Sequence, residues 1–313
     1  MDYVISLAVF ATIYAIAALS FNLLIGHAGI FSVAHAAFIG IGAYATGILT
    51  SRLTGLFPLA IVLGALVAAG VGWVFARATL RVSGDYMVVA SFALLVIFAQ
   101  IFTNWTGVTG GGAGLASIPR PGFVDGDLLG NNLLFGLLCV LVAALMYFVS
   151  HRIVYSPLGR VLRALRENED AAASLGKFVR RFRGVVFAVS SAMAAVAGSL
   201  YAHFMSYVSP LDFTVHLTVL VLTMVIVAGT GRLWAVPVAA ALVMGITDGV
   251  RYVDLPQQIA PGAQQILYGL LLVLFAVFRP EGLLGRKRDR ASQPGGTPGV
   301  PAQSLEAQDG GEK

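Results

Sequence analysis

The sequence predicts an all-α polytopic membrane protein, a helical bundle of about 8 to 10 transmembrane helices. Hydrophobic residues make up 58% of the 313 positions and charged residues only 11%. A soluble domain carries about a quarter charged residues, because its surface needs a polar shell. Uncharged apolar runs recur along the chain, and Lys and Arg gather in the short segments between them. This alternation is typical of membrane spans joined by cytoplasmic loops.

Composition also excludes several classes of protein. The single cysteine, Cys139, lies inside an apolar run, so neither a disulfide framework nor a CxxC metal site is expected. The five histidines form no HExxH pattern, and no stretch matches GxxxxGK[ST]. We therefore expect no catalytic residues, no metal, no cofactor and no phosphate loop. The net charge of +5 does not indicate nucleic-acid binding, because the basic residues lie between apolar spans.

The uncharged runs define nine expected spans. The 49 residues from Tyr3 to Ser51 carry no charge, which is too long for one span and fits two around the glycine-rich break "IGHAGIFSVAH". The first run has neither a basic leader nor a cleavage site, so it is expected to be retained. If this break enters the protein and returns, the number of spans becomes ten and the N-terminus lies inside. The expected spans are Val4–Leu24, Ser32–Thr50, Leu53–Ala76, Tyr86–Thr103, Leu128–His151, Gly184–Phe204, Phe213–Gly231, Leu233–Gly249 and Gln264–Phe278.

The positions of Lys and Arg predict the orientation of the bundle. Eight lie between Arg152 and Arg183, five lie between Arg279 and Arg290, and others are Arg77, Arg81 and Arg232. If the spans alternate, all of these fall on one side, which is the cytoplasm. Residues 1–285 then form the membrane domain, with its first residue outside. The polar, Gly- and Pro-rich residues 286–313 form a disordered cytoplasmic tail.

The charged loop 155–183 contains a predicted amphipathic helix. From Arg160 to Leu175 the apolar residues share one side, and Gly176 is placed to end the helix. The simpler interpretation is a surface helix that obeys the charge rule for cytoplasmic loops. However, such a loop needs only basic residues, and a mixed-charge amphipathic helix can dock in a partner's groove. The apolar set is Val161, Leu162, Leu165, Ala172 and Leu175, and the charged set is Arg163, Arg166, Glu167 and Asp170.

Small residues recur at helix–helix spacing, as in Ala36 with Gly40 and Ala194 with Gly198. Close packing of helices is the simpler interpretation. The alternative is a translocation path lined by glycine. For a histidine within a span, packing in the core is likewise the simpler interpretation. An acid near the end of a span is either functional or lies at the membrane–water interface. The candidate residues for a substrate path are His35, Gly40, Gly42 and Asp248.

Four stretches together resemble one family. "GRVLRALRENEDAAASLG" is similar to the cytoplasmic coupling segment of branched-chain amino-acid ABC transporter permeases of the LivM type. "GIFSVAHAAFIGIGAYATGIL" resembles an early small-residue element of that family, and "LRVSGDYMVVASFALLVIFAQIFTNWTGVTGGGAGL" resembles its middle element. "FRPEGLLG" resembles the segment that ends the membrane part in that family. The resemblance covers about residues 14 to 285.

The resemblance implies an importer subunit of a bacterial cytoplasmic (inner) membrane that works by alternating access. Its implied partners are a second, LivH-type permease or a second copy, two ABC ATPase subunits and an extracytoplasmic substrate-binding protein. The implied cargo is a branched-chain amino acid. The same machinery with urea, a short amide or another small polar solute is the alternative, and a stand-alone secondary transporter or a membrane enzyme is disfavoured by the scarcity of acids within the spans. The residues implied to couple to the ATPase are Arg160, Arg163, Arg166, Glu167, Asp170, Ala171, Ala172, Leu175 and Gly176.

Overall fold

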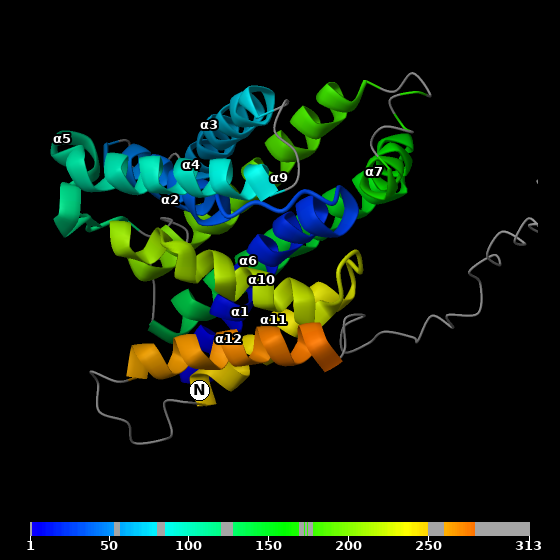
Figure 1. Ribbon diagram of the computed structural model, residues 1–313. Coiled ribbons are helices and arrows are strands. Elements are labelled where there is room, and N and C mark those ends of the chain that lie inside the picture. The colour runs from blue at the N-terminus through cyan, green and yellow to red at the C-terminus, as the bar shows by residue number, and fades with distance from the viewer. Residues whose placement is uncertain are drawn as a thin grey trace, which may run out of the picture.

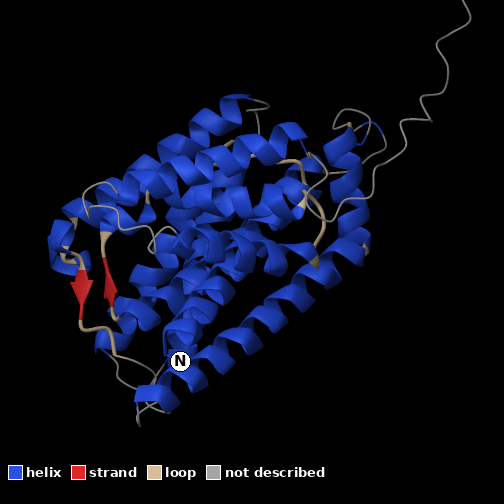
Figure 2. Ribbon diagram, turned by 90° about the horizontal axis from the view of Figure 1, so that it is seen from below, coloured by secondary structure: helices blue, strands red, loops and turns tan. Residues whose placement is uncertain are grey.

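The computed structural model describes residues 2–52, 57–79, 85–119, 128–168, 172, 174, 178–249 and 260–278. Within them the chain is a bundle of helices, with one short strand pair at its edge (Figure 1, Figure 2). The strands β1 (Leu115–Ala116) and β2 (Tyr207–Val208) are antiparallel and join two loops at one end of the bundle. The predicted all-α architecture is confirmed. The expected tail 286–313 lies outside the described residues.

Each of the nine expected spans corresponds to one helix of the described chain. Five helices are long and apolar enough to cross a membrane, and α10, α11 and α12 are shorter apolar helices. The helices are α1 (Asp2–Asn22), α2 (His35–Arg52), α3 (Phe57–Ala78), α4 (Asp85–Asn104), α6 (Leu128–Tyr155), α9 (Val179–Met205), α10 (Val215–Ala228), α11 (Ala235–Gly249) and α12 (Ala260–Phe278). Shorter elements join them: the π-helix η1 (Leu23–His27), α5 (Thr106–Thr109), the 3₁₀ helices η2 (Gly111–Ala113) and η4 (Pro210–Phe213), and α7 (Pro157–Glu167).

The helix α9 lies at the centre of the bundle. Its apolar stretch is 72% buried, against 17% for α4 and α6, whose sides are exposed and apolar. Glycines bring α2 and α9 into backbone contact, because a Cβ at Gly42 would lie 2.1 Å from the carbonyl oxygen of Ala195. A Cβ at Gly198 would lie 1.9 Å from the carbonyl oxygen of Ile39. Close packing through small residues is therefore confirmed for this pair of helices.

The glycine-rich break folds back into the bundle. The helix α1 continues directly into η1. Residues 28–34 form an irregular turn, and α2 begins at His35 instead of the expected Ser32. The Nε2 of His35 lies 2.8 Å from Ser20 Oγ and 3.2 Å from the carbonyl oxygen of Ala17. The start of α2 thus lies beside the second half of α1, some way inside the bundle. Each of the two segments is a single helix of the described chain, and the number of membrane crossings, nine or ten, stays a prediction.

The described basic segments share one end of the bundle. The side chain of Arg166 in α7 contacts Gly26 in η1, and α7 lies at the opposite side of the bundle from α5 (Figure 1). A groove of about 760 Å³ at the basic end is lined by Arg77 of α3 and by residues at the start of α9. At the other end, the hydroxyl of Tyr3 donates to the carboxylate of Asp248 at the end of α11.

Candidate functional site

The charged loop begins with a well-capped helix, α7. Ser156 is its N-cap, with Oγ accepting from the Leu158 backbone N–H at 3.2 Å, and Pro157 occupies the first helical position. Leu162 is fully buried and Leu165 nearly so. A Cβ at Gly159 would lie 2.1 Å from the carbonyl oxygen of Val154, so the helix turns tightly against the end of α6. The predicted apolar side exists, and it packs on this chain's own core.

The helix α7 ends earlier than predicted. The expected helix ran from Arg160 to Leu175, whereas α7 ends at Glu167, and Asn168 is extended at φ −156° and ψ 109°. Glu167 is the last residue of α7, and an acid is unfavourable at the negative end of a helix dipole. Asn168 also favours caps and turns over helix interiors. Asp170, Ala171, Leu175 and Gly176 lie outside the described residues.

The exposed face of α7 is charged. Arg160, Arg163, Arg166 and Glu167 are exposed, whereas Ala172 is only 3% exposed and belongs to the hydrophobic core. The side chain of Ala172 is thus covered by this chain, and its predicted role in coupling to the ATPase stays a prediction. Arg163 lies back along the helix and contacts the carbonyl oxygens of Gly159 and Val154 at 3.4 and 3.5 Å. The surface available to a partner is the charged one.

Arg166 connects α7 to two other segments at the basic end. Its guanidinium donates to the carbonyl oxygen of Gly26 in η1, and a Cβ at Gly29 would lie 2.8 Å from Arg166 Cγ. The backbone N–H of Gly231, in the turn between α10 and α11, donates to Asn22 Oδ1 at 2.9 Å. A Cβ at Gly26 would lie 2.5 Å from the nitrogen of Gly231. We call this contact of Asn22, Gly26, Gly29, Arg166 and Gly231 the Arg166 joint.

The Arg166 joint has two features of a segment that changes conformation. The end of α1 is a π-helix, a form that is rare and frequent at functional sites. The amide Nδ2 of Asn22 is buried and has no hydrogen-bond partner among the described residues. Such a group costs about 1–3 kcal/mol relative to a satisfied one. The joint is therefore tightly packed and incompletely hydrogen-bonded.

A cavity of about 280 Å³ opens near the other end of the bundle. Asp248, a predicted path residue, lines it and accepts the hydrogen bond from Tyr3. Its walls mix hydroxyl, amide and apolar groups from five helices, α1, α9, α10, α11 and α12. The lining residues are Tyr3, Ser6, Leu7, Phe10, Tyr14, Tyr201, Met205, Leu220, Met244, Thr247, Asp248, Gln264 and Tyr268.

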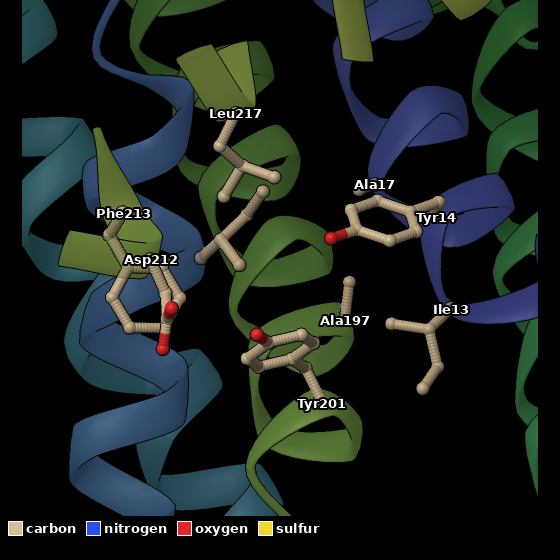
Figure 3. Close-up of a pocket in the computed structure, with 9 residues that line it drawn as sticks. Ile13, Tyr14, Ala17, Ala197, Tyr201, Asp212, Phe213 and Leu217 are labelled. Atoms are coloured by element: carbon tan, nitrogen blue, oxygen red, sulfur yellow. The ribbon is translucent and has the colours of Figure 1, made fainter. Parts of the chain in front are cut away.

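A second, smaller cavity of about 20 Å³ lies deeper and shares Tyr14 and Tyr201 with the first. Its volume holds about one water molecule. The two tyrosine hydroxyls and the carboxylate of Asp212 come to it from α1, α9 and η4 (Figure 3). Neither hydroxyl makes a hydrogen bond with the described part of the chain. The remaining walls are apolar: Ile13, Ala17, Ile39, Ala197, Phe213 and Leu217.

Asp212 is held by its own turn. Its Oδ2 accepts from the backbone N–H of Ser209 at 2.9 Å, and Ser209 Oγ accepts from the N–H of Leu211 at 3.3 Å. These reciprocal bonds fix η4 against the bundle. Partial burial raises the pKa of Asp212 above its ordinary value, and the bond from Ser209 opposes that rise. The carboxylate is thus rigid and partly desolvated.

Three of the four predicted path residues do not line either cavity. His35 is 1% exposed and stacks on Phe21 with ring centroids 4.5 Å apart, so it is a packed core residue. A Cβ at Gly40 would lie 2.7 Å from Phe102, and Gly42 faces the α9 backbone. These residues hold helices together, as the simpler interpretation of small residues and buried histidines states. Only Asp248 reaches a cavity.

Sequence reasoning missed Tyr14, Tyr201 and Asp212. The tyrosines sit inside apolar runs, where an aromatic residue usually indicates ordinary core. Asp212 did carry a signal, because "SPLD" at 209–212 has the spacing of a capping box with proline at the first helical position. That motif fixes a helix start directly before an apolar run. Among the described residues, no group of three or more His, Cys, Asp or Glu is placed to hold a metal ion.

Comparison with known proteins agrees with this arrangement. Residues 3–276 match the family model described as the permease component of branched-chain amino acid transport systems. The chain is 30% identical to the high-affinity branched-chain amino acid permease protein LivM of Escherichia coli K12, over 91% of this chain and 70% of that protein. It is 26% identical to a probable LivM of Methanocaldococcus jannaschii, over 92% and 94% of the two chains.

The second permease type of the same systems is also similar. The chain is 26% identical to LivH of Escherichia coli K12, over 87% of this chain and 91% of LivH. No solved structure gives a significant match. The matched family model spans nearly all the described helices. The chain therefore belongs to the family of permease components of branched-chain amino acid transport systems.

Proposed function

We propose that this permease subunit, which is itself no enzyme, forms part of the translocation path for branched-chain amino acids and is driven by ATPase subunits that dock on α7. Its partners are two ABC ATPases, a second permease of LivH type or a second copy, and an extracytoplasmic binding protein. The similarity to both LivM and LivH supports pairing of two related permeases. The basic end faces the cytoplasm, and the cavity end faces the binding protein.

One observation carries the proposal: a single helix connects the exposed charged face of α7 to the cavities. Arg166 contacts Gly26 at the end of η1, and Tyr14, twelve residues earlier in the same continuous helix, lines both cavities. At 1.5 Å per residue these two points are about 18 Å apart. A displacement of α7 by an ATPase therefore moves a cavity wall through one continuous helical element. Only such a differential contact can shift the balance between two states.

The turn between α10 and α11 transmits the same displacement to the opposite wall. Gly231 bonds to Asn22, and the two helices that leave this turn line the larger cavity through Leu220, Met244 and Asp248. Movement at the Arg166 joint would thus reach the cavity from two sides. This arrangement suits alternating access, in which one end opens as the other closes.

Uptake into proteoliposomes tests the proposal. The full-length chain would be co-expressed with its partner permease and ATPases and reconstituted with ATP inside and leucine-loaded binding protein outside. We expect radiolabelled leucine to accumulate only with hydrolysable ATP. Accumulation of urea or acetamide with no accumulation of leucine would assign the machinery to the alternative cargo. Leucine uptake that needs an ion gradient and no ATP would contradict coupling to an ATPase.

The orientation predicts which engineered thiols can be reached in intact cells. In a Cys139→Ser background, Ser174→Cys at the basic end should resist an impermeant maleimide, and Leu211→Cys at the other end should react. Both positions are exposed, and Leu211 is 80% exposed, so burial does not protect either thiol. Both thiols should react fully once the membrane is permeabilised. Labelling of Ser174→Cys in intact cells would invert the proposed sidedness.

A further inference from the structure

The smaller cavity has the chemistry of a site for an alkylammonium group. We propose that Asp212, Tyr14 and Tyr201 together bind the ammonium group of an aliphatic amino acid as it passes through the permease. The inference deepens the proposed function and rests on it for the identity of the cargo. It names the group that the site recognises and separates amino-acid cargo from neutral amides.

The polar atoms of this cavity match what an ammonium group requires. An ammonium carries three donors and no acceptor. The cavity offers one carboxylate and two tyrosine hydroxyl oxygens, which come from three different elements. One oxygen of Asp212 is occupied by the Ser209 N–H, and no hydrogen bond engages the other within the described residues. Both hydroxyls likewise have no hydrogen-bond partner there, so all three groups can accept or reorient toward a ligand.

Electrostatics favour a cation at this position. Tyr14, Tyr44 and Tyr201 all lie within the field of the Asp212 carboxylate. No Lys or Arg lines either cavity, and no ion pair with Asp212 occurs within the described chain. A partly buried carboxylate without a cationic partner is disfavoured in its charged form. A bound ammonium would supply the missing charge and form charge-assisted hydrogen bonds, which are roughly twice as strong as neutral ones.

The sizes of the two cavities decide which part of the ligand each one holds. Around the polar corner the cavity is lined by Ile13, Ala17, Ile39, Ala197 and Leu217. With room for about one water, the closed site does not admit a whole amino acid. The adjoining cavity of about 280 Å³ includes the same two tyrosines and extends to Tyr3 and Asp248. The ammonium would therefore reach the deeper cavity first, with the side chain and carboxylate still in the larger one.

Two conservative variants test the site. Asp212→Asn removes the negative charge and keeps an oxygen that can cap Ser209, so η4 should remain folded. Tyr201→Phe removes one hydroxyl at nearly equal volume. Tyr207→Phe is the matched control, because its hydroxyl donates to the carbonyl oxygen of Ala113 in a loop away from the cavity. Tyr207→Phe should also leave ATP hydrolysis without binding protein unchanged, and all three variants should assemble with the ATPases.

Leucine uptake at saturating loaded binding protein is the first readout. We expect Asp212→Asn to slow it about tenfold to a hundredfold, the range for a lost hydrogen bond to a charged group. Tyr201→Phe should slow it less, and Tyr207→Phe should transport at the wild-type rate. If Asp212→Asn fails to assemble, the leucine uptake rate of Tyr201→Phe compared with that of Tyr207→Phe decides whether the ammonium site exists. Wild-type rates in both Asp212→Asn and Tyr201→Phe would overturn the inference.

Thermal unfolding of the purified complex is the second readout and separates the inference from the proposed function. 3-Methylbutylamine, which has the ammonium and no carboxylate, should raise the melting temperature of the wild type and not of Asp212→Asn. 4-Methylpentanoate, which lacks the ammonium, should have no effect. Stabilisation by both compounds, or by neither, would overturn the ammonium site. An Asp212-dependent effect of the amine in a complex that does not take up leucine would refute the proposed cargo and leave the site standing.

Discussion

Gly198→Leu is expected to eliminate the folded protein from the membrane. A Cβ at this position would lie 1.9 Å from the carbonyl oxygen of Ile39 and 2.7 Å from its carbon, and these backbone atoms cannot rotate away. The side chain would force α2 and α9 apart along a helix whose apolar stretch is 72% buried. Overpacking of a core costs about 1–3 kcal/mol even where side chains can adjust. A backbone clash between two central helices should exceed that range.

Gly70→Leu provides the matched control. Gly70 lies in α3 and is exposed, and no atom of the described chain lies within 4 Å of the position that a Cβ would occupy there. The same substitution should therefore leave the fold intact. Membrane levels, and elution as a single peak after detergent extraction, would be compared for the two variants. A monodisperse Gly198→Leu protein at Gly70→Leu levels would show that α2 and α9 are not held by backbone contact.

The sequence allowed the architecture to be predicted because its signal is spread over many residues. Charge-free runs of nearly fixed length are required by the thickness of the hydrocarbon core, so each of the nine predicted spans matches a helix. The pair of small residues Ala194 and Gly198 likewise predicted close packing, and Gly198 contacts the backbone of α2. Helix ends were less predictable. The helix α7 ends at Glu167 because Asn168 is extended, although the apolar pattern continues to Ala172.

The candidate site was predicted poorly because it is made by distant residues. Tyr14, Tyr201 and Asp212 come from three elements, and none of them is unusual in its own segment. His35 was a candidate path residue with packing as its simpler interpretation, and Ser20 and the backbone of Ala17 satisfy it within the core. A local sequence pattern predicts the properties of a single helix. A cavity depends on which faces of several helices meet, and that is fixed by packing.

Arg166→Ala is expected to abolish transport in a protein that still folds and inserts. The helix α7 is held on the core by Leu162 and Leu165, so removing one exposed guanidinium should not displace it. What is lost is the hydrogen bond to Gly26, which carries movement of α7 into η1 and so to Tyr14. Leucine uptake should fall by at least about tenfold, which corresponds to the loss of about 1.4 kcal/mol of coupling between the two ends.

Two further variants separate this role from the charge of the loop. Arg152→Ala removes one positive charge from the neighbouring end of α6, where Arg152 lies over the ring of Phe148, and should transport normally. Arg166→Lys keeps the charge and loses the planar guanidinium, which Lys does not replace in a fixed geometry. If Arg166 acts only through its charge, Arg166→Lys will transport at the wild-type rate and Arg152→Ala will be as impaired as Arg166→Ala.

The ATPase readout shows where the connection breaks. In the wild type, loaded binding protein should stimulate ATP hydrolysis, because its effect must travel from the cavity end to α7 by the same path. The effect of loaded binding protein must cross the same joint in the opposite direction, so a variant that breaks this contact should lose the stimulation as well. Arg166→Ala should therefore bind the ATPases and hydrolyse ATP at the basal rate, with no response to loaded binding protein. Full stimulation in Arg166→Ala would place the connection elsewhere than at the Arg166 joint, and loss of ATPase binding would show that Arg166 belongs to the docking surface itself.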